Sequence, residues 1–497
     1  MDGMVTGKSA SPLPAFIPNW ISGRQVPAAA GSTFVKLSPA SGEQLCTVAR
    51  SKAADVDGAV SSAADAQRGW AALPGVRRGE ILHAVANALE RERAAMAEVV
   101  ALETGKSRKH ADGEVHAAVA LGRFMAGEGQ RLYGRTTTSA TPHKSAMTIR
   151  EPLGVAGLII AANTPIANVA WKVFPALICG NSAVLKAAED TPATAWLFGR
   201  IAFEAGLPPG VLNIVQGLGL ESGVPLVEDA RVAVVSFTGS TAVGKQIAVT
   251  TGKRLARVSL ELGGKNPFVV CDDADLKKAS RWAVQSAFSN AGQRCASGSR
   301  LLVFDSVYDE FKKILLADTA ALRVGSGDDD DFGPVINERQ LNNILASVEK
   351  ARAAGAKVIA GGHRLDDESH RGGFFIAPTL VEDVAADAEL SVTELFGPVA
   401  SLYRVTGFEN AIEVANKSPY GLTACIHTRS FDRAMEFVRR AECGVVVVNA
   451  GTFGSEAHMP FGGVKQSGNG SREPGTEALD VYSNLKDVYL NADPLGL

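Results

Sequence analysis

The sequence predicts an α/β protein built on two mainly parallel β-sheets, with a smaller β element beside them. The chain has 497 residues, which is too long for one ordinary hydrophobic core and favours two large domains. Short, mainly apolar segments such as "GVAGLII" (154–160) and "SAVLK" (182–186) alternate with helical segments. This alternation is typical of parallel strands that are covered by helices on both faces of a sheet.

The first half of the chain supplies the elements of one such domain. Apolar residues at helical spacing predict one long helix over 76–106 and another over 114–134, which ends in glycines. The polar, β-branched stretch 136–152 predicts an exposed hairpin. A helix over 191–206 separates two of the apolar strands, which are predicted at 154–160, 182–186, 210–215, 232–237 and 256–262.

The alternation resumes after residue 265 and predicts a second α/β domain from about 262 to 450. Helices are expected near 274–290, 307–323 and 337–354. Strands are expected at 266–270, 300–304, 356–362, 399–405, 422–428 and 444–449. The tail 483–497 reads as a further strand that pairs either with the 136–152 hairpin or with a partner subunit.

Composition narrows the classes of function. A net charge of −3 leaves no strongly basic surface for nucleic acid, and the longest apolar run, 153–162, is far too short to span a bilayer. The six cysteines form no CxxC pair and have no histidine at metal-ligand spacing, so we expect neither a metal site nor a disulfide framework. Such cysteines fit a reducing compartment, and we expect a cytoplasmic protein whose partners are small molecules or its own copies.

Cys295 in "FSNAGQRCASGSR" (288–300) is the first candidate for chemistry. Residue type alone favours a packed core thiol, because free cysteine is among the most buried residues. A nucleophile is the alternative, and the local stretch does not decide between them.

Two stretches could bind a dinucleotide. "QGLGLESG" (216–223) only approaches the GxGxxG fingerprint, and a plain glycine-rich loop explains it as well. In "VAVVSFTGSTAVGK" (232–245) a strand breaks at Thr238, Gly239 and Ser240 into a helix start, which either binds an anion or is a simple N-cap. Lys186 and Glu189 follow another strand end, where ligands bind in open α/β sheets, but a charged loop explains them too.

Several motifs, taken in order, make the chain resemble the aldehyde dehydrogenase superfamily. "VSLELGGKNP" (258–267) precedes "FSNAGQRC" so that Glu261 and Cys295 are 34 residues apart. "TELFGP" (393–398) is similar to the family's ExFGP element, and "MPFGGVKQSGNGSREPG" (459–475) to its PFGGxKxSG element. "FTGSTAVG", "KAAE" and "AANTP" are similar to its cofactor and asparagine motifs. The resemblance covers residues 20–488, nearly the whole chain.

The resemblance implies oxidation of an aldehyde to a carboxylic acid by NAD(P)+. Cys295 would be the nucleophile that forms a thiohemiacetal and then a thioester, and Asn163 would stabilise the oxyanion. Glu261 would be the general base that hydrolyses the thioester, and Lys172 would belong to the proton and cofactor network. Because Glu261 is present, hydrolysis is favoured over transfer of the acyl group to coenzyme A. Taken singly, Asn163 could only begin a turn and Lys172 could be a solvated helix residue.

The resemblance also places the cofactor on named residues. Glu189 near the adenosine ribose would repel a 2′-phosphate, so NAD is preferred and NADP remains possible. Phe396 could equally be a packing residue. The predicted cofactor-binding residues are Lys186, Glu189, Thr238, Gly239, Ser240, Gly244, Leu262, Glu394 and Phe396.

Positions that line the family's substrate tunnel are small or polar here, because Ala162 replaces a common aromatic and Gly113 and Ala117 are small. We therefore expect a polar aldehyde such as a semialdehyde or hydroxyaldehyde. Arg294 either pairs with a substrate carboxylate or forms a salt bridge with a nearby acid. The candidate substrate residues are Thr164, Asn168, Trp171, Arg294, Ser455 and Glu456.

The fold implied by the resemblance is α/β, with a Rossmann-like cofactor domain, a second α/β catalytic domain and a small β oligomerisation element. Residues 1–135 and 151–261 would form the NAD(P)-binding domain and 262–455 the catalytic domain. Residues 136–150 and 470–497 would form the oligomerisation element of a homodimer or homotetramer. An esterase or acyl-transferring activity and a non-enzymatic relative are the rival functions, and the presence of both Cys295 and Glu261 argues against the latter.

Overall fold

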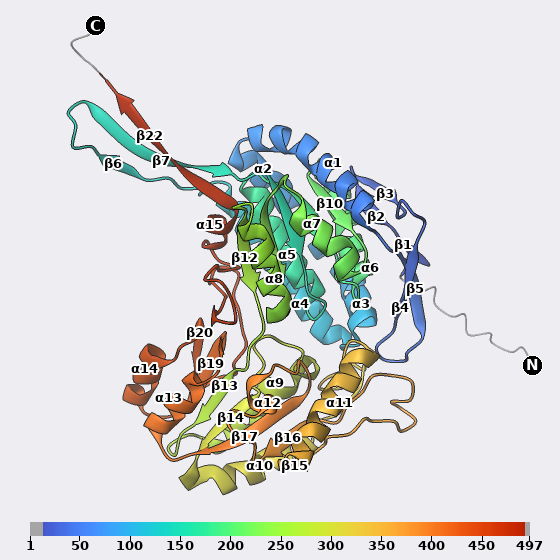
Figure 1. Ribbon diagram of the computed structural model, residues 1–497, viewed down its shortest axis with the longest axis vertical. Coiled ribbons are helices and arrows are strands. Elements are labelled where there is room, and N and C mark those ends of the chain that lie inside the picture. Colours follow the sequence, from blue (N-terminus) through green and yellow to red (C-terminus); the bar gives the residue numbers. More distant parts are fainter. Residues whose placement is uncertain (1–12, 493–497) are drawn as a thin grey trace, which may run out of the picture.

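The computed structural model describes residues 13–492. The predicted domains reach into residues 1–12 and 493–497, which lie outside the described residues. Figure 1 shows two α/β lobes, one above the other, and a thin β arm that projects from the upper lobe. The upper lobe comes mainly from the first half of the chain and the lower lobe from the second half.

The first sheet has seven strands in the order β12-β11-β8-β9-β10-β2-β3. The five strands that the sequence predicts are parallel, and β2 and β3 add an antiparallel edge. In chain order the strands are β2 (Asn19–Ile21), β3 (Arg24–Val26), β8 (Val155–Ile159), β9 (Ser182–Lys186), β10 (Leu212–Val215), β11 (Val232–Thr238) and β12 (Arg257–Glu261).

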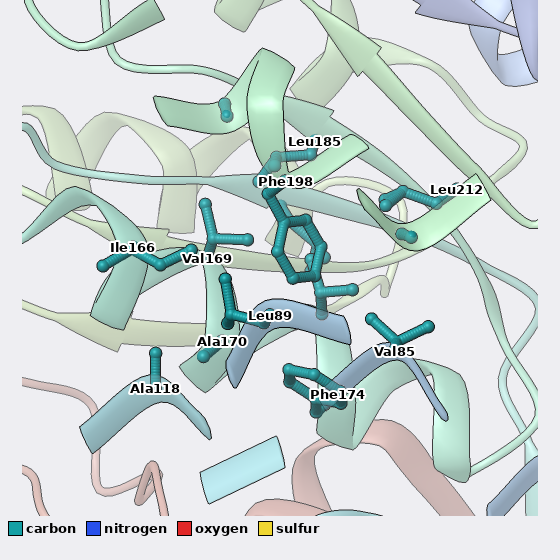
Figure 2. Close-up of a cluster of buried hydrophobic side chains, with 14 of the residues drawn as sticks. Val85, Leu89, Ala118, Ile166, Val169, Ala170, Phe174, Leu185, Phe198 and Leu212 are labelled. Atoms are coloured by element: carbon teal, nitrogen blue, oxygen red, sulfur yellow. The ribbon is translucent and has the colours of Figure 1, made fainter. Parts of the chain in front are cut away.

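Helices cover both faces of this sheet. One face packs on α1 (Ala53–Ala72), α7 (Val224–Glu228) and α8 (Thr241–Gly252). The other packs on α5 (Pro165–Ile178) and α6 (Pro192–Glu204), which are backed by α2 (Gly75–Arg91), α3 (Arg93–Thr104) and α4 (Arg108–Glu128). A π-helical turn, η1 (Gly219–Gly223), precedes α7. Figure 2 shows the core of the second face, where Phe174 and Phe198 lie among aliphatic side chains such as Val85, Leu185 and Leu212.

The second sheet also has seven strands, in the order β15-β16-β17-β14-β13-β19-β20. All are parallel except the edge strand β15, which runs antiparallel to β16. The strands are β13 (Pro267–Val270), β14 (Arg300–Phe304), β15 (Lys357–Ala360), β16 (Thr379–Glu382), β17 (Val399–Val405), β19 (Thr423–His427) and β20 (Val445–Val448). The helices are α9 (Leu276–Phe288), α10 (Tyr308–Ala320), α11 (Glu338–Ala353), α12 (Glu389–Val392), α13 (Phe408–Asn416) and α14 (Phe431–Arg440), with short turns η2 (Ser289–Gly292) and η3 (Asp305–Val307).

The projecting arm is a three-stranded antiparallel sheet of β6 (Thr136–Thr138), β7 (Lys144–Pro152) and β22 (Ser483–Asn491), in the order β22-β7-β6 (Figure 1). The tail strand β22 pairs with β7 of the hairpin, one of the two partners predicted for it. The remaining elements are β1 (Phe16–Ile17), β4 (Thr33–Leu37) and β5 (Gln44–Ala49), the pair β18 (Tyr420–Gly421) and β21 (Val464–Lys465), and α15 (Ala478–Tyr482).

Several element boundaries differ from the sequence predictions. The single helix expected over 76–106 is two helices, because the backbone of Glu92 leaves the helical region (φ −97°, ψ 15°). The helix expected from 114 begins at Arg108, where the hydroxyl of Ser107 accepts a hydrogen bond from the N–H of His110. Strand β16 was missed, and the antiparallel edges were missed because strand direction is set by tertiary pairing.

Candidate active site

The segment 262–266 joins β12 of the first sheet to β13 of the second and builds the centre of the site. A Cβ on Gly263 would lie 1.9 Å from Oε2 of Glu394, and a Cβ on Gly264 would lie 2.5 Å from the carbonyl oxygen of Cys295. The chain needs glycine at both positions, because any side chain would push these neighbours away. The two sheets are thereby brought together where β12 ends at Glu261.

Cys295 lies on the loop after α9, and an unusual backbone directs that loop. Asn290, Ala291 and Gly292 all have positive φ angles (55°, 54° and 67°), which turn the chain sharply after the helix. The amide of Asn266 then donates to the carbonyl oxygens of Cys295 (2.7 Å) and Ser297 (2.9 Å). Asn266 is a positioning residue that the sequence analysis missed, although it stands in the "GGKNP" motif.

Two cavities meet at Cys295, and Asn163, Thr164, Ala167, Trp171 and Phe461 border both of them. The Arg294 cavity has a volume of about 310 Å³ and is lined by residues of α4, the Arg294 loop and residues 453–455. The Glu394 cavity has a volume of about 350 Å³ and is lined by residues 238–240, Glu261, Leu262, Gln340 and residues 394–396. The half-buried thiol can therefore be reached from two sides.

The electrostatics of the site hold the Cys295 thiol protonated. Burial, together with the charges of Glu394 and Glu261, raises the pKa of Cys295 to about 12. The N–H of Ala296 and the charge of Arg294 act in the opposite direction. Because the thiolate is the nucleophile, the thiol must lose its proton before it attacks a carbonyl.

Asn163 lies between β8 and α5, beside Cys295. Its side-chain amide donates to the carbonyl oxygen of Gln293 at 3.0 Å. The backbone carbonyl oxygen of Asn163 accepts from Nζ of Lys106 (2.9 Å) and from the side-chain amide of Asn290 (3.2 Å). The amide of Asn163 has a second N–H, which can face an oxygen in the cavities that it lines.

Glu261 is a buried carboxylate without a partner. Neither of its side-chain oxygens has a hydrogen-bond partner among the described residues, and only 4% of the residue is exposed. Burial raises the pKa of Glu261 well above its ordinary value, and the charge of Glu473 raises it too, while Lys172 and Arg472 lower it. A carboxyl of this kind is suited to take up a proton near neutral pH.

Lys172 lies on α5 and is not a solvated helix residue, because it is fully buried. Its Nζ donates to Oγ of Ser236 at 2.6 Å and pairs with Oε2 of the equally buried Glu473 at 2.9 Å. Oε1 of Glu473 accepts from the hydroxyls of Ser236 (2.8 Å) and Tyr482 (2.9 Å). Sequence reasoning missed Glu473, because a glutamate in "SREPG" gives no signal of burial.

The residues predicted to bind the cofactor phosphates lie at the end of β11 and the start of α8. Thr238, Gly239 and Ser240 line the Glu394 cavity, and Oγ of Ser240 accepts from the N–H of Val243 at 3.4 Å as the N-cap of α8. A Cβ on Gly244 would lie 2.5 Å from Cδ2 of Leu262, so the glycine lets α8 pack closely against that side chain. Residues 238–240 therefore both cap α8 and form part of the cavity wall.

Glu394 and Phe396 lie on the opposite wall of the same cavity. Oε1 of Glu394 accepts from the N–H of Gly264 at 3.0 Å, and burial raises the pKa of Glu394 to about 7. Phe396 has a left-handed backbone (φ 54°). The amide of Gln340 on α11 donates to the carbonyl oxygens of Leu395 (2.6 Å) and Phe396 (3.2 Å), which makes Gln340 a further positioning residue that the sequence analysis missed.

Lys186 and Glu189 lie at and just past the end of β9, outside the lining of both cavities. Nζ of Lys186 lies 3.9 Å from Oε2 of Glu189, and the same oxygen accepts from the N–H of Gly219 at 3.0 Å. Nη2 of Arg339, from the second half of the chain, lies 4.0 Å from Oε1 of Glu189.

The predicted substrate residues divide into three groups. Thr164, Trp171, Arg294 and Ser455 line the Arg294 cavity. Asn168 lines only the Glu394 cavity, and its amide donates to the carbonyl oxygen and hydroxyl of Thr164 (2.9 and 3.1 Å). Glu456 lines neither cavity, and its exposed carboxylate lies 3.7 Å from Nε2 of His458.

The walls of the Arg294 cavity are more aromatic than the sequence suggested. Phe453 and Phe461 join Trp171 in lining it, and the rings of Trp171 and Phe461 have centroids 5.4 Å apart. The small residues Gly113 and Ala117 line the side formed by α4, as expected. The cavity therefore combines apolar walls with a group of charged side chains.

Comparison with known proteins decides the family. The model of the aldehyde dehydrogenase family matches residues 26–488. The chain belongs to the aldehyde dehydrogenase family. The resemblance found from the motifs and the α/β fold are thereby confirmed.

Relatives in the aldehyde dehydrogenase family share nearly the whole chain. The α-ketoglutaric semialdehyde dehydrogenase of Bacillus subtilis is 37% identical over 475 residues, which cover 95% of this chain and 97% of that protein. The structure of betaine aldehyde dehydrogenase from Staphylococcus aureus in complex with NAD+ has a TM-score of 0.94 and 31% identity, covering 96% of this chain and 95% of that one. The structure of an NADP dependent enzyme of E. coli has a TM-score of 0.92 and 35% identity, covering 96% and 98%.

The described part of the chain, residues 13–492, has neither a membrane-spanning helix nor a cluster of metal-binding side chains. Its helices include none with the length and apolarity that crossing a membrane requires. Its His, Cys, Asp and Glu side chains form no group of three or more that could hold a metal ion.

Proposed function

We propose that this aldehyde dehydrogenase oxidises a polar aldehyde to its carboxylic acid with NAD(P)+ and releases the free acid. The observation that carries the proposal is the position of Cys295, where the Arg294 cavity and the Glu394 cavity meet. An aldehyde in the first cavity and a cofactor in the second would both reach the thiol. The names of the relatives cover different aldehydes, so the substrate must be inferred from the cavity itself.

Cys295 begins the reaction by adding to the aldehyde. The thiol proton passes to solvent water, the sulfur of the resulting thiolate forms a bond to the carbonyl carbon, and the carbonyl oxygen takes up the negative charge. The second N–H of the Asn163 amide and the backbone N–H of Cys295 are the donors we assign to that oxygen. Loss of one such donor typically raises the barrier by about 2.7–4 kcal/mol.

The Glu394 cavity fits the nicotinamide end of a dinucleotide. The N-terminus of α8 favours an anion at Thr238, Gly239 and Ser240, with Gly244 and Leu262 fixing the approach of that helix. Glu394 presents a carboxylate to ribose hydroxyls across the cavity, beside Phe396. When bound, the nicotinamide supplies the hydride acceptor that the oxidation requires.

Glu261 completes the reaction by hydrolysing the thioester on Cys295. A water proton passes to the carboxylate while the water oxygen bonds to the acyl carbon, and the Cys295 thiolate leaves as the acid forms. The Lys172–Glu473 pair sets the affinity of Glu261 for that proton, because Glu473 raises its pKa and Lys172 lowers it. Because no group among residues 13–492 hydrogen-bonds to the Glu261 oxygens, they are free to bind a water molecule.

The direct test is NAD(P)H formation, followed by its near-ultraviolet absorbance, with a panel of alkyl, aromatic, hydroxy- and carboxy-aldehydes. Both NAD and NADP are supplied in turn. We expect turnover with at least one polar aldehyde and release of the free acid without coenzyme A. Absence of turnover with every aldehyde and either cofactor would contradict the proposed function.

We further propose that Lys186 and Glu189 bind the adenosine ribose, so that NAD is preferred over NADP. The Glu189 carboxylate would repel a 2′-phosphate, and like charges brought together cost several kcal/mol. Replacing Glu189 by serine is expected to shift the NAD/NADP ratio of kcat/KM toward NADP by about 10-fold or more. The measurement is kcat/KM with each cofactor at one fixed aldehyde concentration, and an unchanged ratio would remove Glu189 from this role.

The arm of residues 136–150 and the tail 470–497 is proposed to mediate assembly into a homodimer or homotetramer. Apolar side chains are exposed on its strands: Ile149, Leu485, Tyr489 and Leu490. Burial against a second copy would remove this surface from water. Sedimentation velocity is expected to give a dimer or tetramer mass, and a monomer at micromolar concentration would contradict the assignment.

Two further proposals concern organisation and location. Residues 1–135 and 151–261 are proposed to form the NAD(P)-binding domain, and residues 262–455 the catalytic domain, in line with the two seven-stranded sheets. A cytoplasmic location is proposed because the six cysteines are all free thiols. Cell fractionation tests the location, and limited proteolysis between the sheets tests the boundary.

A further inference from the structure

The charged side chains that line the Arg294 cavity differ in whether they form an ion pair. Lys106, His110 and Arg294 line it on the basic side, and Glu114 is the one acidic residue of its lining. The carboxylate of Glu114 is already engaged. Its Oε2 pairs with Nζ of Lys106 at 2.7 Å, and its Oε1 accepts from the N–H groups of Ile166 (3.0 Å) and Ala167 (3.3 Å) at the start of α5.

Lys106 is likewise satisfied by its neighbours. Besides Glu114, its Nζ donates to the carbonyl oxygen of Asn163 at 2.9 Å. Lys106 and Glu114 therefore form a buried, neutral pair that fixes α4 and α5 around Asn163. Neither of the two is left to bind a charged ligand.

Arg294 has no such partner. Its Nε donates to Oγ of Ser289 at 3.1 Å, and its guanidinium lies over the ring of Phe453, 5.0 Å from the centroid. Across residues 13–492, no carboxylate lies within salt-bridge distance of the group, and its two Nη atoms donate no hydrogen bond. Of the two alternatives that the sequence left open for Arg294, the structure thus removes the salt bridge with a nearby acid.

An unpaired, half-buried guanidinium in a cavity is costly unless an anion satisfies it. Its planar fork matches the two oxygens of a carboxylate, whereas one hydroxyl or carbonyl uses only part of it. The stacking on Phe453 holds the fork at the wall of the cavity, one residue from the nucleophile. Trp171 and Phe461 supply apolar walls against which a short methylene chain can pack.

We propose that the substrate is an aldehyde with a carboxylate at its other end, and that Arg294 binds this carboxylate while Cys295 receives the aldehyde carbon. This inference rests on the proposed function and narrows its substrate from polar aldehydes to semialdehydes of carboxylic acids. The hydroxyl of Ser455, on the cavity wall formed by residues 453–455, is a second donor for the same carboxylate. Hydroxyaldehydes without a carboxylate are poorer substrates, because they leave the guanidinium unpaired.

The experiment compares each acid with its own neutral ester. The probes are malonic, succinic and glutaric semialdehydes and their methyl esters, assayed with the full-length enzyme and its better cofactor. For the best acid of the series, kcat/KM is expected to exceed that of its ester by about 10- to 100-fold, the usual range for a charge-assisted hydrogen bond. Replacing Arg294 by glutamine (R294Q) is expected to remove this preference mainly through a higher KM for the acid, with the ester little changed.

Two further measurements distinguish a loss of carboxylate binding in R294Q from a displacement of the neighbouring Cys295. The matching dicarboxylate is expected to inhibit ester oxidation competitively, and its inhibition constant should rise about 10-fold or more in R294Q. Arg294→Lys keeps the charge without the fork, and is expected to restore part of the acid preference. Equal kcat/KM for acid and ester in the unaltered enzyme would overturn the proposal, and so would R294Q lowering both substrates alike.

The same assays keep this inference separate from the proposed function. If the esters are oxidised as well as the acids, the enzyme is an aldehyde dehydrogenase and only the role of Arg294 is wrong. If neither acids, esters nor any other aldehyde of the panel gives NAD(P)H, the proposed function itself is wrong.

Discussion

Replacing Cys295 by alanine is expected to abolish NAD(P)H formation, with a fall in kcat of more than about 10⁴-fold. An aldehyde carbon does not release hydride readily until a nucleophile has added to it, and the thiol of Cys295 lies where the two cavities meet. Alanine removes the sulfur and leaves the backbone donors and the hydrogen bonds of Asn266 to the loop in place. Steady-state kinetics with the best aldehyde of the panel measure the effect.

Cys443→Ala is the matched control. Cys443 is also a half-buried free thiol, but it lines neither cavity, and its sulfur donates to the carbonyl oxygen of Val445 (3.2 Å). We expect this variant to keep its turnover. If Cys295→Ala retained activity near that of the control, Cys295 would not be the nucleophile, and the reaction would need another route.

Much of the fold could be predicted because its core strands are locally consistent. The strands β8, β9 and β13 are rich in apolar residues and buried throughout, so sequence pattern and tertiary environment agree. The edge strand β15 is only partly buried, and its antiparallel direction depends on pairing with β16, which lies on a separate four-residue segment. Local sequence carries no signal for such a pairing.

The candidate site likewise contains residues that the sequence could predict and residues that it could not. Cys295, Glu261 and Asn163 stand in motifs whose residue types imply chemistry. In the structure Cys295 and Asn163 line both cavities, and Glu261 lines the Glu394 cavity. Asn266 and Gln340 were missed because each acts on backbone carbonyl groups of another segment.

Burial and pairing of charged side chains were equally invisible in the sequence. Glu473 pairs with Lys172 across 301 positions of the chain, and no local pattern reports such a contact. Arg294 shows the opposite case, because the sequence offered two partners for its charge and only the structure shows that the described residues supply neither an ion pair nor an acceptor for its Nη atoms.

The second large effect is expected for Glu261→Gln, which should separate the two halves of the reaction. Glutamine has nearly the same shape but takes up no proton, so the thioester should form on Cys295 and hydrolyse slowly. We expect steady-state kcat to fall by about 10²- to 10⁴-fold, the usual contribution of a general base. Rapid-mixing absorbance should show a burst of NAD(P)H equal to the enzyme concentration, and mass spectrometry of the quenched enzyme should find the acyl group on Cys295.

The pH dependence gives an independent readout of the same residue. A general base acts in its deprotonated form, and burial raises the pKa of Glu261 well above its ordinary value. Steady-state turnover should therefore rise with pH through that elevated pKa and level off above it. The burst rate reports Cys295, whose pKa burial raises to about 12, so it should keep rising where hydrolysis has levelled off.

Glu310→Gln, an exposed glutamate on α10, provides the matched control and should change neither phase. In Glu261→Gln the rising limb of hydrolysis that depends on the carboxylate should vanish, while the burst keeps its own pH dependence. Linear product formation without a burst, at a rate lowered as much in the first turnover as in later ones, would show that Glu261 acts before the thioester forms. In that case the unpartnered carboxylate would be a base for the Cys295 thiol rather than for water.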